Sequence, residues 1–515
     1  MTPRDTNVLF VVLDQMRADC LHGALADAAL SQNPNSMSNI RALMDDGVSF
    51  TNHVSVTSPC GPARASILTG QYAMNHHSVR NGTPLAHDKP NLARSLRAGG
   101  YQALLYGYTD TSPDPREYNA NDPVLTSYEQ VLPGFFEALE MRFDDSRTWR
   151  GYLAAKGYDV PSGKGIYVPD GPQPNSPAIY KAEHSDTAYL TDRLLQDLPT
   201  RGDGWCAHVT YIRPHPPFVA PAPYNTMFSA KDMPPPAGGE ASGAHPFDVP
   251  AINYRQLSDM IVGFPDIQPT PENIAAIRAI YMGLANEVDH HFGRIISYLK
   301  ASGQYENTLI VVTADHGEML GDYSCWGKVS YFDAAFRTPL IIRLPDNRGN
   351  DDASTTPLAA GSRVSLPTES IDITPTILDV LGLDIPDSMD GRSLLPILAG
   401  TQPDDWRRYS VSELDFGDPV NPTIWQRELG LSSAECNLTI LRTDTHNLIH
   451  FGGELPQILF DHKANAEGID ISDAPGSDAL RLGHSEMLLS HKMIHSRGLF
   501  SQTMITESGA VRGEF

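Results

Sequence analysis

Five short apolar runs, separated by helical segments, constrain the fold more than any other feature of this sequence. The runs are continuous rather than alternating, which is typical of strands buried on both faces of a parallel sheet. They occupy residues 7–13, 101–106, 205–212, 308–313 and 339–344. Helical periodicity is clearest over residues 273–301 and is also present over 92–97 and 374–381. Because strands that alternate with helices form sheets covered on both faces, the sequence predicts an α/β fold.

The last part of the 515-residue chain differs in character from the rest. It contains short strand-like pieces, followed by a polar helical segment near residues 478–496. We therefore expect a large, mostly parallel central sheet flanked by helices in a catalytic domain over residues 1–405. Residues 406–515 are expected to form a smaller C-terminal α+β subdomain with an oligomerisation tail. Residues 112–168 and 234–245 are expected to be rich in loops, and the second stretch to act as a flexible lid.

Charge and hydropathy exclude some classes of partner. The formal net charge is −24, from 38 basic and 62 acidic side chains, so a nucleic acid backbone would be repelled. No apolar run reaches the roughly 20 residues that a membrane helix needs. Residues 1–15 lack the layout of a signal peptide, and the five cysteines fit neither a zinc ribbon nor a disulfide framework. We expect a cytoplasmic protein without a nucleic acid or membrane partner.

Polar side chains follow two of the predicted strands. Asp14 and Gln15 come directly after the first strand, and Asp315 and His316 follow the strand over residues 308–313. The carboxyl ends of parallel strands collect chemistry in α/β folds, and carboxylate, amide and imidazole groups are ligands for divalent cations. Taken alone, Asp14 also fits an N-capping loop residue, and the second segment also fits a polar turn.

Cys60 lies just before a probable helix start, in the segment from Cys60 to Gly70. Pro62 suits a first helical turn, and the N-terminal helix dipole would favour an anion at the cysteine. Arg64 lies four residues on and would point back at Cys60. An isolated cysteine of this kind is equally a buried structural residue. Three scattered polar residues, Asn81, His215 and Lys328, gain interest only beside the other segments.

Together these segments resemble the sulfatase branch of the alkaline phosphatase superfamily. The stretch from Cys60 to Gly70 is similar to the sulfatase signature C-x-P-[SA]-R-x-x-x-[LM]-T-G at every defined position. The resemblance spans most of the chain. It also includes Asp315-His316-Gly317-Glu318, Tyr281, Glu287-Val288-Asp289, Asp372-Ile373-Thr374-Pro375-Thr376, Asp390-Gly391-Arg392-Ser393-Leu394-Leu395 and Leu459-Phe460-Asp461.

The resemblance implies an alkaline-phosphatase-like fold and a formylglycine at position 60. The formylglycine would be made from Cys60 by maturation machinery of the cell and would act as the nucleophile. One divalent metal ion would be held by Asp14, Gln15, Asp315, His316 and residue 60. Arg64 would steady the nucleophile, Asn81 would donate to a substrate oxygen, and His215 and Lys328 would bind the anion or protonate the leaving group.

Within the family, Gly107-Tyr108-Thr109-Asp110 resembles the phosphonate monoester hydrolases and related arylsulfatases. That resemblance implies Mn²⁺ rather than Ca²⁺ and substrate binding by Tyr108 and Asp110. Asp110 departs from the subgroup, which has a hydroxyl residue there. A carboxylate at this place repels an anionic substrate unless it is protonated or paired.

The resulting prediction is a hydrolase of sulfate monoesters, phosphonate monoesters and phosphodiesters that acts through a covalent intermediate. Its substrate would be a small anionic ester, and a homodimer or homotetramer is expected. One alternative is a phosphodiesterase or phosphomutase of the same superfamily, with a Ser or Thr nucleophile and two metals. The other alternative is a non-catalytic binding protein that kept the fold.

Overall fold

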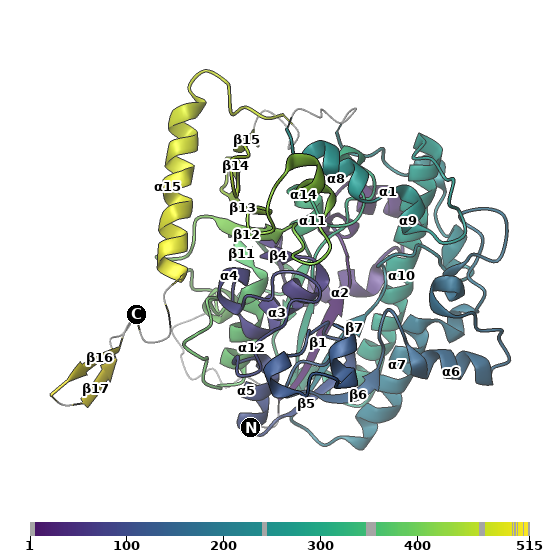
Figure 1. Cartoon of the computed structure of the whole chain (residues 1–515). Helices are drawn as coiled ribbons and strands as arrows, with labels where there is room; N and C mark the ends of the chain where they lie inside the picture. The colour runs from purple at the N-terminus through teal and green to yellow at the C-terminus, as the bar shows by residue number, and fades with distance from the viewer. Residues whose placement is uncertain are drawn as a thin grey trace.

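The computed structural model describes residues 6–238, 245–346, 357–462, 469–496, 498, 501, 503–507 and 509–512. An eight-stranded sheet forms its centre, in the order β10-β2-β9-β8-β1-β7-β5-β6 (Figure 1). Only β9 runs against its neighbours β8 and β2, so the prediction of a mostly parallel sheet is confirmed. The strands are β1 (Asn7–Leu13), β2 (Val48–Phe50), β5 (Gln102–Gly107), β6 (Phe136–Glu140), β7 (Trp205–Tyr211), β8 (Thr308–Thr313), β9 (Leu340–Arg343) and β10 (Ser362–Val364).

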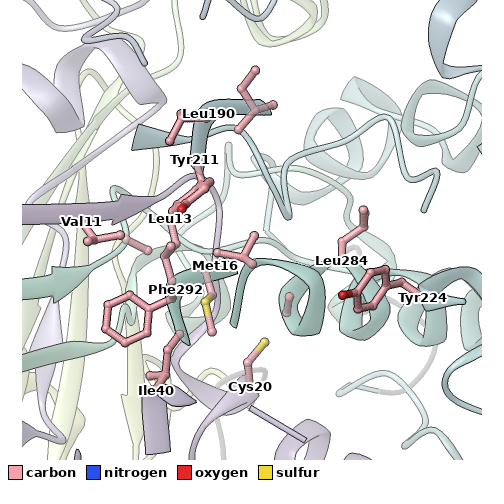
Figure 2. Close-up of a cluster of buried hydrophobic side chains, with 14 of the residues drawn as sticks. Val11, Leu13, Met16, Cys20, Ile40, Leu190, Tyr211, Tyr224, Leu284 and Phe292 are labelled. Atoms are coloured by element: carbon pink, nitrogen blue, oxygen red, sulfur yellow. The ribbon is translucent and has the colours of Figure 1, made fainter. Parts of the chain in front are cut away.

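Strand β1 contributes to both cores, because successive side chains of a strand point to opposite faces. Leu9, Val11 and Leu13 face one core, where they meet α2 (Ser38–Asp46), α7 (Asp186–Asp197) and α10 (Pro271–Ala301). Figure 2 shows Val11 and Leu13 in this core together with Ile40 and Phe292. The alternate residues Val8, Phe10 and Val12 face the second core, formed with α3 (Cys60–Thr69), α5 (Leu92–Ala98) and α12 (Ile373–Val380).

A second sheet lies beside α3 and α15 (Ser477–His495), in the order β15-β14-β13-β12-β4. Its strands are β12 (Ser410–Asp415), β13 (Asn437–Arg442), β14 (His446–Phe451), β15 (Ile458–Asp461) and the short β4 (Thr57–Ser58). Strand β4 pairs in parallel with β12 and ends two residues before Cys60. The C-terminal sheet therefore holds the chain that leads into α3, while the division of the chain at residue 405 stays a prediction.

The remaining elements are short. They are α1 (Ala24–Gln32), α4 (Ala73–His76), α6 (Arg147–Ala155), α8 (Asp248–Tyr254), α9 (Leu257–Met260), α11 (Asp333–Phe336), α13 (Leu395–Leu398), α14 (Ile424–Leu429), the paired strands β3 (His53–Val54) and β11 (Thr368–Glu369), and the hairpin of β16 (Thr503–Thr506) and β17 (Gly509–Arg512). Figure 1 shows this hairpin projecting away from the two sheets. Among the described helices, none combines the length and the apolar character required to cross a bilayer.

The expectation of loops over residues 112–168 was wrong in part. This stretch contains β6, which adds to the sheet edge beside β5, and α6. Strand β6 escaped sequence reasoning because it carries two glutamates and an exposed Phe136, as an edge strand can. In the expected lid, residues 239–244 lie outside the described residues.

Candidate active site

The predicted metal ligands converge at the carboxyl end of the central sheet. Asp14 directly follows β1, Asp315 and His316 follow β8, and Cys60 is the first residue of α3. One ligand atom from each of these four buried residues lies within 4.8 Å of all the others. The sulfur of Cys60 is 3.2 Å from Nε2 of His316 and 3.9 Å from Oδ1 of Asp14.

Two backbone features allow this convergence. Gln15 has a φ of 65°, in the left-handed region, so the chain turns sharply after Asp14. The backbone N–H of Gln15 then donates to Oδ1 of Asp315 at 3.0 Å. Gly317 packs so close to α11 that a Cβ there would be 2.0 Å from the carbonyl oxygen of Ala334. Only glycine allows the segment after His316 to approach α11 this closely.

Arg64 is shared between the two carboxylates and balances only one of their charges. Its NH2 lies 3.2 Å from Oδ2 of Asp14 and 2.9 Å from Oδ2 of Asp315. Burial and the charge of Asp315 raise the pKa of Asp14 to about 6, and Arg64 opposes that rise. Burial also acts to raise the pKa of Asp315, but His316 and Arg64 together bring it below its usual value. The site thus concentrates negative charge that a cation can stabilise.

The donor set fits a divalent cation. Oδ2 of Asp315 is buried and accepts no well-directed hydrogen bond, despite its ion pair with Arg64. Nδ1 of His316 lies 3.0 Å from the carbonyl of Gly317, so donation there leaves the Nε2 lone pair facing Cys60. Gln15 approaches the same space, with Oε1 2.7 Å from Nζ of Lys328.

Lys328 connects the sulfur of Cys60 to His215. Nζ of Lys328 lies 3.0 Å from this sulfur and 3.1 Å from Nε2 of His215. Burial and Lys328 hold the pKa of His215 well below its usual value, so this imidazole is neutral near pH 7. The N-terminal dipole of α3 was expected to favour an anion at Cys60, and two other effects oppose it. Burial and the charge of Asp14 raise the pKa of its thiol well above the usual value and outweigh Lys328.

The predicted substrate-binding residues surround the start of α3. Oδ1 of Asn81 accepts the backbone N–H of Gly61 at 2.9 Å. Tyr108 donates its hydroxyl to Asp14, and its ring lies 4.2 Å from the guanidinium carbon of Arg64. Asp110 is 5% exposed, and its Oδ2 is 3.9 Å from Nε of Arg64. Burial raises the pKa of Asp110 well above its usual value.

All of the predicted site residues therefore lie in one region, but their roles stay predictions. Asp14, Gln15, Cys60, Asn81, Tyr108, Asp110, His215 and Lys328 line one cavity of about 400 Å³, while Arg64, Asp315 and His316 lie beneath them. The carboxyl ends of β1 and β8 and the close approach of Gly317 to α11 explain this arrangement.

Sequence reasoning missed two groups of residues. Glu318 is fully buried, accepts the side-chain amide of Gln15 and the N–H groups of Leu320 and Gly327, and so fixes the orientation of Gln15. Its place in the Asp-His-Gly-Glu segment was the available signal. The second group forms the outer wall of the cavity, where no motif marks the residues. It includes Arg80, Tyr128, Glu129, Phe143, Asp144, Lys164 and Trp425.

Comparison with known proteins agrees with this geometry. The Sulfatase family model matches residues 6–383. The multifunctional alkaline phosphatase superfamily protein PehA of Trinickia caryophylli is 37% identical over 507 residues, covering 95% of this chain and 96% of that protein.

Two solved structures share the fold over nearly the whole length. The phosphonate monoester hydrolase SpPMH from Silicibacter pomeroyi has a TM-score of 0.93 and 50% identity, covering 99% of both chains. The phosphonate monoester hydrolase of Agrobacterium radiobacter has a TM-score of 0.90 and 37% identity, covering 99% of this chain and 100% of that one. The expected alkaline-phosphatase-like fold is thus confirmed, and the chain belongs to the sulfatase family of the alkaline phosphatase superfamily.

Proposed function

We propose that this hydrolase of sulfuric or phosphonate esters depends on a divalent metal ion and on a formylglycine derived from Cys60. Its substrates would be sulfate monoesters, phosphonate monoesters and phosphodiesters, cleaved through a covalent intermediate at position 60. One observation carries the proposal. The side chain of Cys60 meets Asp14, Asp315 and His316 within 4.8 Å, in the strand-end position where α/β enzymes bind ligands. The names of the two phosphonate monoester hydrolases and of PehA support the substrate classes.

Asp14, Gln15, Asp315 and His316 would hold the metal together with residue 60. Two carboxylates, an amide oxygen and one imidazole favour Mn²⁺ over Ca²⁺, because Ca²⁺ takes oxygen ligands almost exclusively. A bound divalent ion supplies positive charge that stabilises anionic oxygens and lowers the pKa of a coordinated hydroxyl.

A hydrated aldehyde at position 60 supplies two hydroxyls on one carbon, one to attack the ester and one whose deprotonation releases the product. Overall, one water is consumed and the ester is divided into its alcohol and a sulfate or phosphonate. Arg64 holds positive charge beside Asp14 and Asp315 throughout.

Lys328 and His215 act on the substrate side of Cys60. The ammonium of Lys328, between Gln15, Cys60 and His215, binds oxygens of the anion. Nδ1 of His215 lies against the carbonyl of Pro216, so donation there leaves Nε2 to accept from Lys328. This hydrogen-bonded pair holds a proton that can pass to the leaving oxygen.

One alternative needs a second metal cluster. In the part of the chain that the structure describes, Asp14, Cys60, Asp315 and His316 form the single group of three or more His, Cys, Asp or Glu side chains suited to a metal. This favours one metal per chain over the two-metal phosphodiesterase or phosphomutase. A non-catalytic relative would have no need for the Lys328–His215 pair beside the sulfur.

Partner and location complete the proposal. Cys60 is only 4% exposed, so a maturation enzyme must reach it before the chain has folded. We place this maturation and the enzyme itself in the cytoplasm, and we propose that the chain forms a homo-oligomer, a dimer or a tetramer.

The test replaces Cys60. Cys60→Ala is expected to lower kcat/KM for an aryl sulfate and an aryl phosphonate at least about a thousandfold. The melting temperature should stay close to wild type, and the other four proposed ligands should still bind Mn²⁺, although more weakly. Cys206→Ala is the matched control. Cys206 is also buried, but it is the second residue of β7, whereas the site lies at the carboxyl ends of the strands. Peptide mass spectrometry of the wild type should show sulfur replaced by oxygen with the loss of two hydrogens at position 60. Turnover by Cys60→Ala within tenfold of wild type would reject the covalent scheme.

A further inference from the structure

The cavity continues outward from Cys60 past His215, and its outer wall is acidic. Seven acidic side chains line the whole cavity against four basic ones, although the proposed substrate is an anion. Arg80 and Asp415 neutralise each other at 2.6 Å. The acidic residues are Asp14, Asp110, Glu129, Asp144, Asp259, Asp415 and Asp418, and the basic residues are Arg80, Lys164, Arg255 and Lys328. The excess of negative charge therefore lies in the outer part of the cavity.

Glu129 is the most buried charged residue of this outer wall. It is 3% exposed, and both of its carboxylate oxygens lie 3.2 Å from the backbone N–H of Asp144. Within the described part of the chain, Glu129 forms no ion pair within 4.0 Å. Burial and the charge of Asp144 raise the pKa of Glu129 to about 7, and Arg142 opposes that rise. A cationic ligand beside this carboxyl group would therefore stabilise its charged form.

Asp110 gives an independent sign of a missing partner. It lines the same cavity and is more than nine-tenths buried, yet its Oδ1 has no hydrogen-bond donor. The nearest cation, Arg64, is 3.9 Å from the other oxygen and is already shared between Asp14 and Asp315. A buried acceptor without a donor is rare in folded proteins and marks a place where a ligand or water completes the bonding.

The aromatic residues of the wall lie on the leaving-group side. The ring of Phe143 packs edge-on against His215, with centroids 4.7 Å apart, and Tyr128 precedes Glu129 in the same lining. The chain itself places an ammonium here, since Nζ of the exposed Lys164 lies 5.6 Å from the centre of the Phe143 ring. This ring face is therefore compatible with a cation.

We propose that the cavity selects esters whose alcohol part carries an amine or quaternary ammonium group, bound between Phe143 and the Glu129–Asp144 wall. The substrate then carries both charges, with its anionic end beside Lys328 and its cationic end at the ring of Phe143, which packs against His215. The inference rests on the proposed function, because His215 defines the leaving-group side. It adds a charge preference that the ester chemistry alone does not require.

A pair of isosteric substrates tests the preference. The 4-(trimethylammoniomethyl)phenyl and 4-neopentylphenyl esters differ only in nitrogen replacing a quaternary carbon, and both are prepared as sulfates and as phosphonates. The quantity measured is the ratio of kcat/KM for the cationic ester to that for the neutral ester. Comparing this ratio between variants cancels the intrinsic reactivity of the two phenols.

Glu129→Gln is expected to lower this ratio about tenfold relative to wild type, mainly through KM, because a desolvated cation beside a carboxylate and an aromatic ring is stabilised by that order. Asp144→Asn is expected to lower it less, because Asp144 is exposed. Asp266→Asn, an exposed carboxylate away from the cavity, is the matched control and should leave it unchanged. Since Asp144 lies on the surface, its variant keeps the test valid if Glu129→Gln unfolds.

The outcomes separate the two proposals. If wild-type enzyme with formylglycine at position 60 hydrolyses neither ester, the proposed function fails. If it hydrolyses both and the ratio is the same in wild type, Glu129→Gln and Asp144→Asn, the charge preference is overturned while the proposed function stands. Faster hydrolysis of a 4-(carboxymethyl)phenyl ester, reduced by Lys164→Gln, would likewise overturn it in favour of an anionic leaving group.

Discussion

Replacing Glu318 by glutamine should impair metal binding, although every proposed metal ligand is kept. Oε1 of Glu318 accepts the N–H of Leu320 at 3.0 Å and that of Gly327 at 2.7 Å, and Oε2 accepts the side-chain amide of Gln15. Three donors thus converge on one carboxylate. In Glu318→Gln one of its oxygens becomes an NH₂ group, so one donor must face another donor.

The least costly rearrangement keeps the amide oxygen on the two backbone N–H groups. The new NH₂ then faces Gln15, whose side chain must flip to present its oxygen to position 318. After this flip, an NH₂ group in place of Oε1 faces Lys328 and the proposed metal. Loss of a buried hydrogen bond to a charged group costs about 1.5–3 kcal/mol, and disturbed outer partners of metal ligands typically cost about 10–100-fold in metal affinity.

We therefore expect Mn²⁺ affinity to fall at least about tenfold, measured by titration calorimetry against a competing chelator, with a melting temperature lower by about 2–6 °C. Glu306→Gln makes the same chemical change on the surface and should have neither effect. Adding Gln15→Glu to Glu318→Gln restores an acceptor toward position 318 and an oxygen toward the metal, so affinity should recover. Unchanged Mn²⁺ affinity in Glu318→Gln, or no recovery in the double variant, would refute the reasoning.

Three further outcomes follow from the structure. Gly317→Ala places a Cβ 2.0 Å from the carbonyl oxygen of Ala334 and should destabilise the fold by about 1–3 kcal/mol in chemical denaturation. The control Gly202→Ala should cost less, because Gly202 is exposed and nothing lies near its Cβ. Nδ1 of His76 accepts the N–H of Ser78, and burial lowers the pKa of His76 to about 3. The neutral imidazole therefore stabilises the folded state fully above the unfolded pKa near 6.5, and this contribution is lost as the pH falls toward 3. This loss is about 2 kcal/mol at pH 5, and His76→Gln should flatten the dependence of the free energy of unfolding between pH 7 and pH 5. Three apolar side chains of α15 are 61–63% exposed, namely Leu482, Leu489 and Ile494. If α15 is part of the expected oligomerisation tail, replacing all three with lysine should reduce the mass of the oligomer measured by light scattering. An unchanged mass would show that α15 does not have that role.

The strands that position the site were predictable because their burial is uniform. All side chains of β1 and β8 are buried, and both strands begin and end at the predicted residues. By contrast, β2 and β10 have three residues each, too few for a pattern. The antiparallel direction of β9 could also not be predicted, because the apolar run of a buried strand is the same for either direction of the strand.

Helix boundaries followed local chemistry where it was strong. Helix α10 begins two residues before the predicted start, because the hydroxyl of Thr270 accepts the N–H of Asn273 at 3.3 Å and Pro271 fits the first turn. The ionisation of Cys60 could not be obtained in this way. A helix N-terminus is a local property, whereas burial and the carboxylate of Asp14, 46 residues away, depend on the tertiary structure.

The same distinction separates the reaction from its selectivity. The proposed nucleophile and metal ligands follow strands or begin a helix. The carboxyl ends of parallel strands share one edge of the sheet, so the sequence alone places Asp14 and Asp315 at that edge. The structure adds that β1 and β8 are neighbours. Glu129 and Asp144 come from two loops around β6, an edge strand that the sequence concealed. No periodicity fixes the path of such loops, so the charge of the outer wall depends on the tertiary structure. Family motifs for this reason constrain which bond is broken more tightly than which alcohol is released.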